Sequence, residues 1–272
     1  MSVTSAHPGP RHLCRAVTDS VTLTGRALAH WRRQPGQFVA GLLFPVLIVL
    51  MFAYLFGGAL SVPGGGDYRE FLLPGMLAMT VVFGIESTYV AVATDTARGV
   101  TDRFRSLPMA SSAVLTGRAV ADLLHGGAAL AVVLACGAAI GWQWRSGAPA
   151  ALAAVGLLLL LRFALICVGI HLALVLGRPE SVVMLQTLVW PLGFASNAFV
   201  SPDTMPGWLA AIAAWNPLSA TVAACRELFG NPGGGGGSFP AEHAIALAVA
   251  WPLLLIAVFG PLAVRRYRGL GR

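Results

Sequence analysis

Residues 149–176 read PAALAAVGLLLLLRFALICVGIHLALVL, a run of small and aliphatic residues interrupted by Arg162 and His171. A helix rises about 1.5 Å per residue, so about 20 apolar residues cross the ~30 Å hydrocarbon core of a membrane. This stretch is therefore long enough to form a transmembrane helix. The same criterion, applied outward along the chain, predicts six spans, at residues 38–60, 71–93, 119–142, 149–176, 181–200 and 244–264.

The composition agrees with an all-α integral membrane protein of six transmembrane helices. Of the 272 residues, 57% are hydrophobic and 11% are charged, and the mean hydropathy is +0.75. Soluble domains have about 25% charged residues. The 18 Lys+Arg residues are all arginine, so the chain has no lysine for a Walker A phosphate loop or a Schiff base. If ATP drives this protein, a separate chain must bind it.

The arginines also predict the orientation of the chain, because short cytoplasmic loops are enriched in them. With the amino terminus inside the cell, Arg69, Arg145 and Arg226 fall outside, Arg162 lies within a span, and the other arginines fall inside. We therefore expect both termini in the cytoplasm and the chain in a plasma membrane. This topology signal explains the net charge of +7, and we expect no nucleic-acid partner.

Four regions outside the spans have structural expectations of their own. Residues 1–37 are expected to form a cytoplasmic segment with an amphipathic helix in the membrane interface, and residues 265–272 a basic cytoplasmic tail. Residues 94–116 carry mixed charge and are expected to present a short coupling helix to a cytoplasmic partner. Residues 201–243 are expected to form an extracellular re-entrant helical hairpin. Asp203 or Thr204 would cap its first helix, and Asn216, followed by Pro217, would cap the second, which would end at Gly230.

Five ionisable residues within the spans are candidates for function, because burying a charge in a membrane is costly; they are Glu86, Asp122, His125, Arg162 and His171. Asp122 lies four residues after Arg118, which predicts a structural ion pair near the cytoplasmic edge. Glu86 and Arg162 lie deeper, and their opposite charges can neutralise each other across a helix interface or around a wet cavity. Packing and substrate-pathway roles both remain open for them.

The sequence has no pattern typical of a metal centre or an enzyme active site. The four cysteines form no C-x-x-C, and no histidine lies near them at ligand spacing. There is also no H-E-x-x-H and no G-x-S-x-G. We expect no catalytic residues, no metal and no disulfide within the chain.

Seven short stretches resemble one family. Gly99 to Met109 read GVTDRFRSLPM, and this segment resembles the cytoplasmic coupling segment of type-2 ATP-binding-cassette (ABC) exporter permeases, in particular the daunorubicin-resistance-type drug efflux permeases of actinobacteria. Further matches bracket it along the chain, at residues 32–36 (RRQPG) and 73–76 (LPGM) before it and at residues 178–180 (RPE), 196–200 (SNAFV), 205–208 (MPGW) and 216–220 (NPLSA) after it. Each match alone is weak, but their order on a six-span chain is specific.

The resemblance implies an exporter built from several chains. Two permease chains, identical or different, would form the pathway, and two copies of a cytoplasmic ATPase would bind ATP and magnesium. The residues that would couple the two are Gly99, Asp102, Arg103, Phe104, Arg105, Ser106, Leu107 and Pro108. The substrate would be hydrophobic or amphipathic, a drug or a lipid, and the hypothetical pathway residues are Glu86, Arg162, Pro191 and Asn197.

Two alternatives remain at the level of sequence. A proton-coupled secondary carrier would use Glu86 as its titrating group, although six spans without a visible inverted repeat are few for that class. A membrane anchor that only recruits a soluble partner would not need the outer hairpin.

Overall fold

The computed structural model describes Gly25, residues 35–55, Gly57, and residues 67–100, 111–233 and 238–269. The predicted interfacial helix falls almost entirely outside these residues. So does the coupling segment beyond Val100, including Asp102 to Pro108. In the part of the chain that is described, all regular elements are helices.

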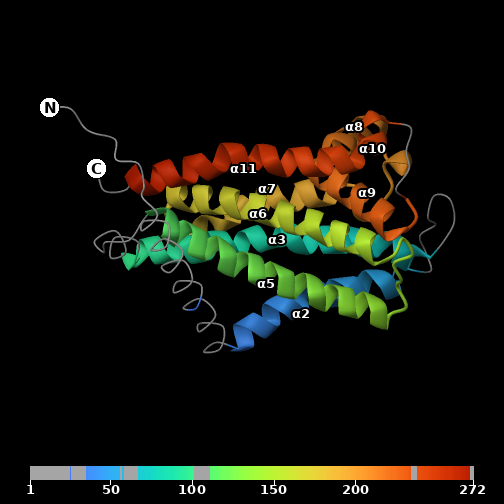
Figure 1. The fold of residues 1–272 in the computed structure, drawn as a ribbon, viewed down its shortest axis with the longest axis horizontal. Coiled ribbons are helices and arrows are strands. Elements are labelled where there is room, and N and C mark those ends of the chain that lie inside the picture. Colours follow the sequence, from blue (N-terminus) through green and yellow to red (C-terminus); the bar gives the residue numbers. More distant parts are fainter. Residues whose placement is uncertain are drawn as a thin grey trace.

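The long helices run side by side, and the short helices between residues 207 and 242 gather at one end of the bundle (Figure 1). We call this the hairpin end, because it holds α8, α9 and α10; α3 and α11 finish at the opposite end. The α-helices are α2 (Pro35–Leu55), α3 (Tyr68–Ala97), α5 (Ser111–Ala139), α6 (Ala148–Leu176), α7 (Val182–Phe194), α8 (Gly207–Trp215), α9 (Pro217–Phe229), α10 (Phe239–Glu242) and α11 (Ala244–Gly269).

Four of the described helices, α3, α5, α6 and α11, are long and apolar enough to cross a membrane. The count rises to five if α8 and α9, which meet at a bend of 76°, form one broken span. These four correspond to the second, third, fourth and sixth predicted spans, with ends that either coincide or differ by up to eight residues. The structure thus supports four to five candidate spans, against the six predicted.

The fifth predicted span is shorter as a helix than expected. At the first, the described apolar helix is Val39–Leu55, and the predicted span continues into residues 56–60, which lie outside the described residues except for Gly57. Helix α7 has 13 residues, or about 20 Å at 1.5 Å per residue. The prediction continued this span to Val200, but the helix stops at Phe194 and the chain turns. Local polar contacts described below cause this turn.

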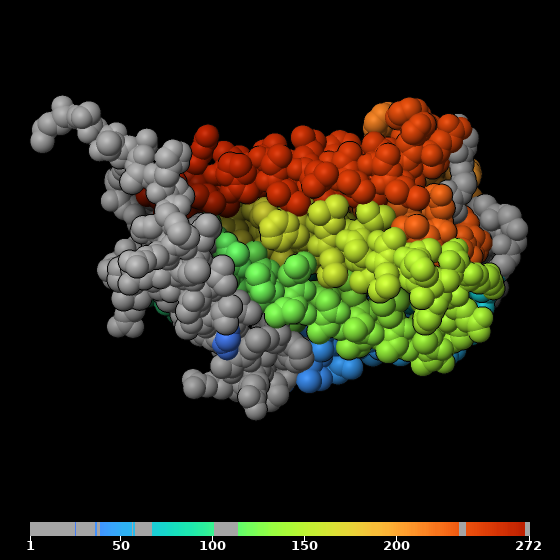
Figure 2. Space-filling model, in the orientation of Figure 1, coloured from blue at the N-terminus to red at the C-terminus, as the bar shows by residue number. Residues whose placement is uncertain are grey.

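Helix α6 is the centre of the bundle. It packs along α3 and α11 and also touches α5 and α9, and Leu158 and Ile166 on it are fully buried. Figure 2 shows α11, α6 and α5 as one continuous face. Large apolar side chains remain exposed on other helices, including Leu47 on α2, Leu188 on α7 and Leu254 on α11. Such surfaces suit contact with lipid.

The ends of α3 follow from local sequence. Asp67 caps its start by accepting a hydrogen bond from the Arg69 backbone N–H at 2.9 Å. At the other end the backbone N–H of Arg98 bonds to the Thr94 carbonyl, and Gly99 has a φ of +67°. A glycine adopts this left-handed conformation without steric cost. Gly99 therefore sets the direction in which the chain leaves α3 toward residues 101–110.

Candidate functional site

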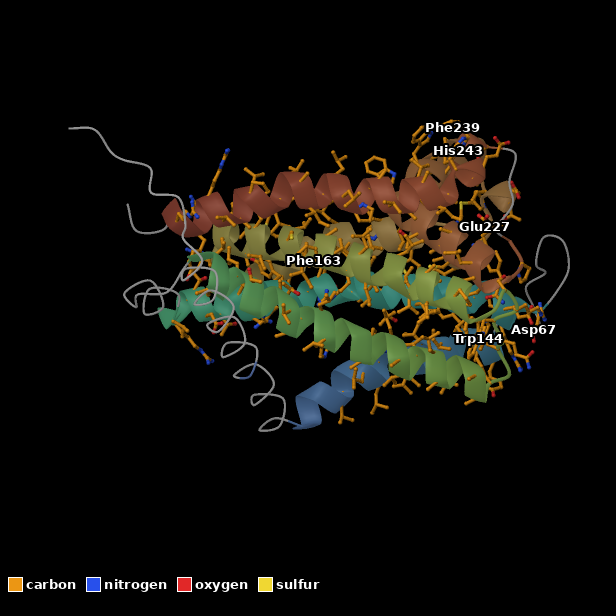
Figure 3. The ribbon with its side chains drawn as sticks, in the orientation of Figure 1. Asp67, Trp144, Phe163, Glu227, Phe239 and His243 are labelled. Carbon is orange, nitrogen blue, oxygen red and sulfur yellow. The ribbon has the colours of Figure 1, made fainter. Side chains whose placement is uncertain are left out.

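Arg162 occupies a tight slot at the midpoint of α6, with 1% of its surface exposed. Phe163, the next residue, is labelled midway along the bundle in Figure 3. A Cβ added to Gly84 on α3 would overlap the Arg162 guanidinium, and one added to Gly126 on α5 would lie 3.0 Å from its Cγ. These two glycines let three helices close around one arginine.

The guanidinium of Arg162 is only partly satisfied by hydrogen bonds. Its Nη2 donates to Thr88 Oγ1 at 3.2 Å, and Thr88 is itself fully buried. Nε and Nη1 are buried without a hydrogen-bond partner. A buried cation with no carboxylate in hydrogen-bond contact is costly in a membrane, so this arrangement is unusual for a residue with a packing role alone.

On α5, one turn before Gly126, Asp122 forms the ion pair with Arg118 that the sequence predicted. Arg118 Nη2 lies 3.0 Å from Asp122 Oδ1, and Arg118 Nε donates to Asp122 Oδ2 at 3.1 Å. The Asp122 side chain is 9% exposed and that of Arg118 is 26% exposed. Asp122 is therefore a buried carboxylate whose partner is partly accessible.

Glu86 does not pair with Arg162, so the expected mutual neutralisation is wrong. Instead Glu86 faces α7, where its Oε2 accepts from Gln186 Nε2 at 2.8 Å and its Oε1 from Trp190 Nε1 at 3.1 Å. The charge pattern could not reveal this, because the rotation of α3 decides which neighbour Glu86 meets. Gln186, a polar residue in a predicted span, was the available signal for this contact.

Asn216 joins α9 to the end of α7. As predicted, it caps α9: its Oδ1 accepts from the Leu218 backbone N–H at 2.9 Å. Its Nδ2 also donates to the carbonyls of Leu192 at 2.7 Å and Ala195 at 3.1 Å. The last carbonyls of a helix lack partners within it, so this side chain stabilises the point where α7 stops.

Arg226 on α9, 0% exposed, is a second buried arginine, and sequence reasoning missed it by assigning it to an outer loop. It donates to the carbonyls of Phe71 (3.0 and 3.1 Å), Asn197 (2.8 Å) and Ala198 (3.2 Å). Its guanidinium carbon lies 3.6 Å from the centroid of the Phe71 ring. Glu227, the following residue, is labelled at the hairpin end in Figure 3. Arg226 thus joins α9, α3 and the turn after α7.

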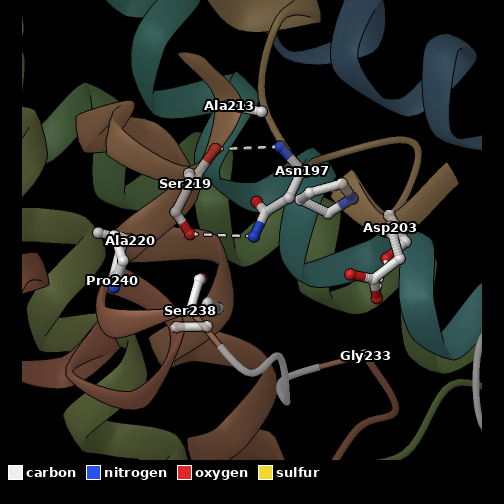
Figure 4. A pocket seen from close by; sticks show the side chains of 13 residues that line it. Asn197, Asp203, Ala213, Ser219, Ala220, Gly233, Ser238 and Pro240 are labelled. Atoms are coloured by element: carbon white, nitrogen blue, oxygen red, sulfur yellow. Dashed lines mark hydrogen bonds between the residues drawn. The ribbon is translucent and has the colours of Figure 1, made fainter. Parts of the chain in front are cut away.

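A small pocket lies beside this turn, within the hairpin end (Figure 4). Asn197 lines it and is 8% exposed. Its backbone N–H donates to Ser219 Oγ at 3.0 Å and its Nδ2 to the Ser219 carbonyl at 3.2 Å, drawn as dashed lines in Figure 4. Its Oδ1 is buried without a hydrogen-bond partner. Asp203 and Ser238 supply further polar lining.

The four predicted pathway residues do not form one site. Glu86 contacts Trp190, and Pro191, the next residue, is exposed on α7. Arg162, on α6, contacts α3 and α5, and Asn197 lies at the hairpin end. Their pathway roles stay predictions. Of the predicted coupling residues, the structure describes Gly99 only.

Known proteins give the context for this geometry. The chain matches the ABC-2 type transporter family over residues 18–229. It is 36% identical over 257 residues to the daunorubicin resistance ABC transporter permease protein DrrB1 of Streptomyces coeruleorubidus, covering 93% of this chain and 88% of that protein. It is 24% identical to DrrC of Mycobacterium tuberculosis, described as a probable doxorubicin resistance ABC transporter permease protein, over 80% of each chain. The family match covers most of the sequence, and the chain therefore belongs to the ABC-2 type transporter family, whose daunorubicin-resistance permease it resembles over nearly its whole length.

Proposed function

We propose that this chain is the permease subunit of an ATP-driven exporter in the plasma membrane. It moves a hydrophobic or amphipathic substrate, a drug or a lipid, out of the cell. Two permease chains form the pathway, and two copies of a cytoplasmic ATPase bind ATP and magnesium. The observation that carries the proposal is membership of the ABC-2 type transporter family. The absence of lysine from the chain agrees with it, because a Walker A lysine must then lie on the partner.

In this proposal the chain crosses the membrane six times with both termini in the cytoplasm. Helices α2 and α7 act as the first and fifth spans, and α8 and α9 form a re-entrant hairpin in the outer leaflet. Trp208 and Trp215 on α8 are largely exposed, and tryptophan is enriched at the headgroup level of membranes. Exposed apolar residues on α2, α7 and α11 supply surface for lipid and for the second permease chain.

Gly99 to Pro108 dock on the ATPase. The alternating charges of Asp102, Arg103 and Arg105 suit charge-assisted hydrogen bonds with a soluble partner. The left-handed turn at Gly99 fixes how this segment leaves α3, and α5 begins soon after it. A movement of the docked segment therefore acts on two central helices at once.

The proposed substrate pathway follows the α3–α7 face and ends near the hairpin end. Along it stand Glu86, beside Trp190, and Pro191 on the exposed side of α7. Asn197 stands at the outer pocket. Arg162 acts from within the bundle rather than from this face.

The test is affinity purification of the tagged chain from its native membrane. We expect an ATPase with a Walker A motif to remain bound and to hydrolyse ATP. Replacing Asp102, Arg103 and Arg105 with Ala should release it. The matched control replaces Arg265 and Arg268, exposed on α11, with Ala, and should retain it.

A different outcome would favour the carrier class. If the chain is recovered alone and moves substrate in liposomes without nucleotide, the ATP-driven proposal is wrong. Collapse of that transport by a proton uncoupler, and its loss in Glu86→Gln, would then identify Glu86 as the titrating group.

A further inference from the structure

The unsatisfied guanidinium of Arg162 points to a second conformation of the bundle. Nε and Nη1 are buried without partners while the slot around them is closed by Gly84 and Gly126. A conformation that brings a carboxylate to these two N–H groups would be favoured, because a paired buried arginine costs far less than an unpaired one.

Asp122 is the carboxylate best placed to meet Arg162. Arg118, Asp122 and Gly126 follow each other at intervals of four residues, so they lie on one face of α5. Gly126 already touches Arg162 in the slot. Asp122 lies about one turn from this contact, and a displacement of α5 along α6 by four residues, about 6 Å, would carry its carboxylate to the level of the Arg162 guanidinium.

The other carboxylate within the predicted spans is already engaged. Glu86 follows Gly84 by two residues on α3, but both of its oxygens accept hydrogen bonds from α7. Asp122, in contrast, is held by Arg118, whose side chain is partly exposed and can be solvated when released. If Asp122 leaves Arg118, water can therefore solvate the Arg118 guanidinium. If Asp122 reaches Arg162, it satisfies the unpaired N–H groups of Arg162.

We propose that Asp122 changes its arginine partner during transport, from Arg118 in the conformation described here to Arg162 in the other. The inference rests on the proposed function, because α5 follows the segment proposed to dock on the ATPase. Movement of that segment displaces α5 relative to α6, and the exchange gives each of the two positions its own ion pair. Asp122 and Arg162 are thus positioning residues: their ion pair stabilises one of the two positions of α5, and the ion pair of Asp122 with Arg118 stabilises the other.

The test compares two double-mutant cycles in the complex of the chain with its co-purified ATPase, reconstituted in lipid nanodiscs. One cycle uses Asp122→Asn and Arg162→Gln, singly and together. The matched cycle uses Asp122→Asn and Arg118→Gln. Each variant is measured by its rate of ATP hydrolysis and by its thermal unfolding midpoint without nucleotide.

We expect Asp122→Asn and Arg162→Gln each to slow ATP hydrolysis about tenfold, and the double variant to be no slower than either. In nucleotide-free unfolding, the coupling between Asp122 and Arg162 should be smaller than the coupling between Asp122 and Arg118, which are in direct contact. Arg162→Lys keeps a cation for Asp122 and should recover part of the rate. If Arg162→Gln does not fold, Arg162→Met, which also removes the cation, replaces it in the cycle.

Two results would overturn the exchange while leaving the proposed function intact. One is a double variant slowed about a hundredfold, the product of two independent tenfold effects. The other is a coupling between Asp122 and Arg162 in nucleotide-free unfolding that equals or exceeds the coupling between Asp122 and Arg118. If no ATPase accompanies the wild-type chain, the proposed function fails, and the ATP-driven exchange fails with it.

Discussion

Replacing Asn216 separates the two tasks of this side chain at the hairpin end. Asn216→Ala removes the cap of α9, which contributes about 1 kcal/mol. It also removes two hydrogen bonds to the Leu192 and Ala195 carbonyls, each contributing about 1 kcal/mol net. The sum is about 3 kcal/mol, or a fall of about 6–12 °C in the unfolding midpoint for a chain of this size.

Asn216→Asp is the matched variant. Aspartate caps a helix as well as asparagine does, but it has no Nδ2 to donate and sets a carboxylate against two carbonyl oxygens. We expect it to retain the cap and to lose about 2 kcal/mol, or about 4–8 °C. The measurement is thermal unfolding of the purified chain in nanodiscs, followed by the reactivity of its buried cysteines, of which Cys225 on α9 is 0% exposed.

The outcomes distinguish the two contributions. Suppose that Asn216→Asp has the unfolding midpoint of the wild type while the midpoint of Asn216→Ala falls by the full amount. The hydrogen bonds to the α7 carbonyls then contribute nothing to stability, and the turn after α7 has another cause. If Asn216→Ala also unfolds with the wild type, the whole account of this junction is refuted.

Three further substitutions test other contacts. Gly84→Ala should lower the unfolding midpoint by the equivalent of about 1–3 kcal/mol, because the new methyl group meets the buried Arg162 guanidinium; Gly127→Ala, with nothing within 4 Å, should leave it unchanged or raise it, and equal midpoints would exclude a tight slot. Arg226→Lys should lower the same midpoint by about 2 kcal/mol, because lysine lacks the planar fork that serves three carbonyls; an unchanged midpoint would contradict that requirement. Gly99→Ala places a side chain at a φ of +67°, at a cost of about 1–2 kcal/mol, and should reduce the ATPase retained on purification; full retention would show that this turn does not position the docking segment.

The sequence predicted what depends on local pattern. Long apolar runs predicted α3, α5, α6 and α11, because hydropathy and length alone decide whether a helix can span a membrane. The cap at Asn216 and the end of α9 at Gly230 were also predictable, since both depend on a few adjacent residues. The length of α7 was not, because its end depends on Asn216, more than 20 residues later.

The candidate site was less predictable, because it depends on which helix faces meet. Glu86 and Arg162 were identified as buried charges, but the partners of Glu86 are the neutral residues Gln186 and Trp190. Arg226 carried no signal of burial, since its partners Phe71 and Asn197 are distant in sequence. The sequence pattern around a charged residue in an exposed loop does not differ from that around a charged residue in a closed pocket, so the tertiary contacts are needed to tell them apart.

Both buried arginines come later in the chain than the groups that receive them. Gly84 and Thr88 on α3 and Gly126 on α5 precede Arg162, and the carbonyls of Phe71, Asn197 and Ala198 precede Arg226. During translation, the residues that contact each guanidinium are therefore synthesised before the arginine itself. An arginine at the centre of a helix costs about 2.5–3.5 kcal/mol on translocon-insertion scales, and this order of synthesis shortens the time that either charge spends without its partners. In a circular permutant that begins at α6, Arg162 would be synthesised before α3 and α5. We expect this permutant to insert into the membrane less efficiently during translation than the natural chain.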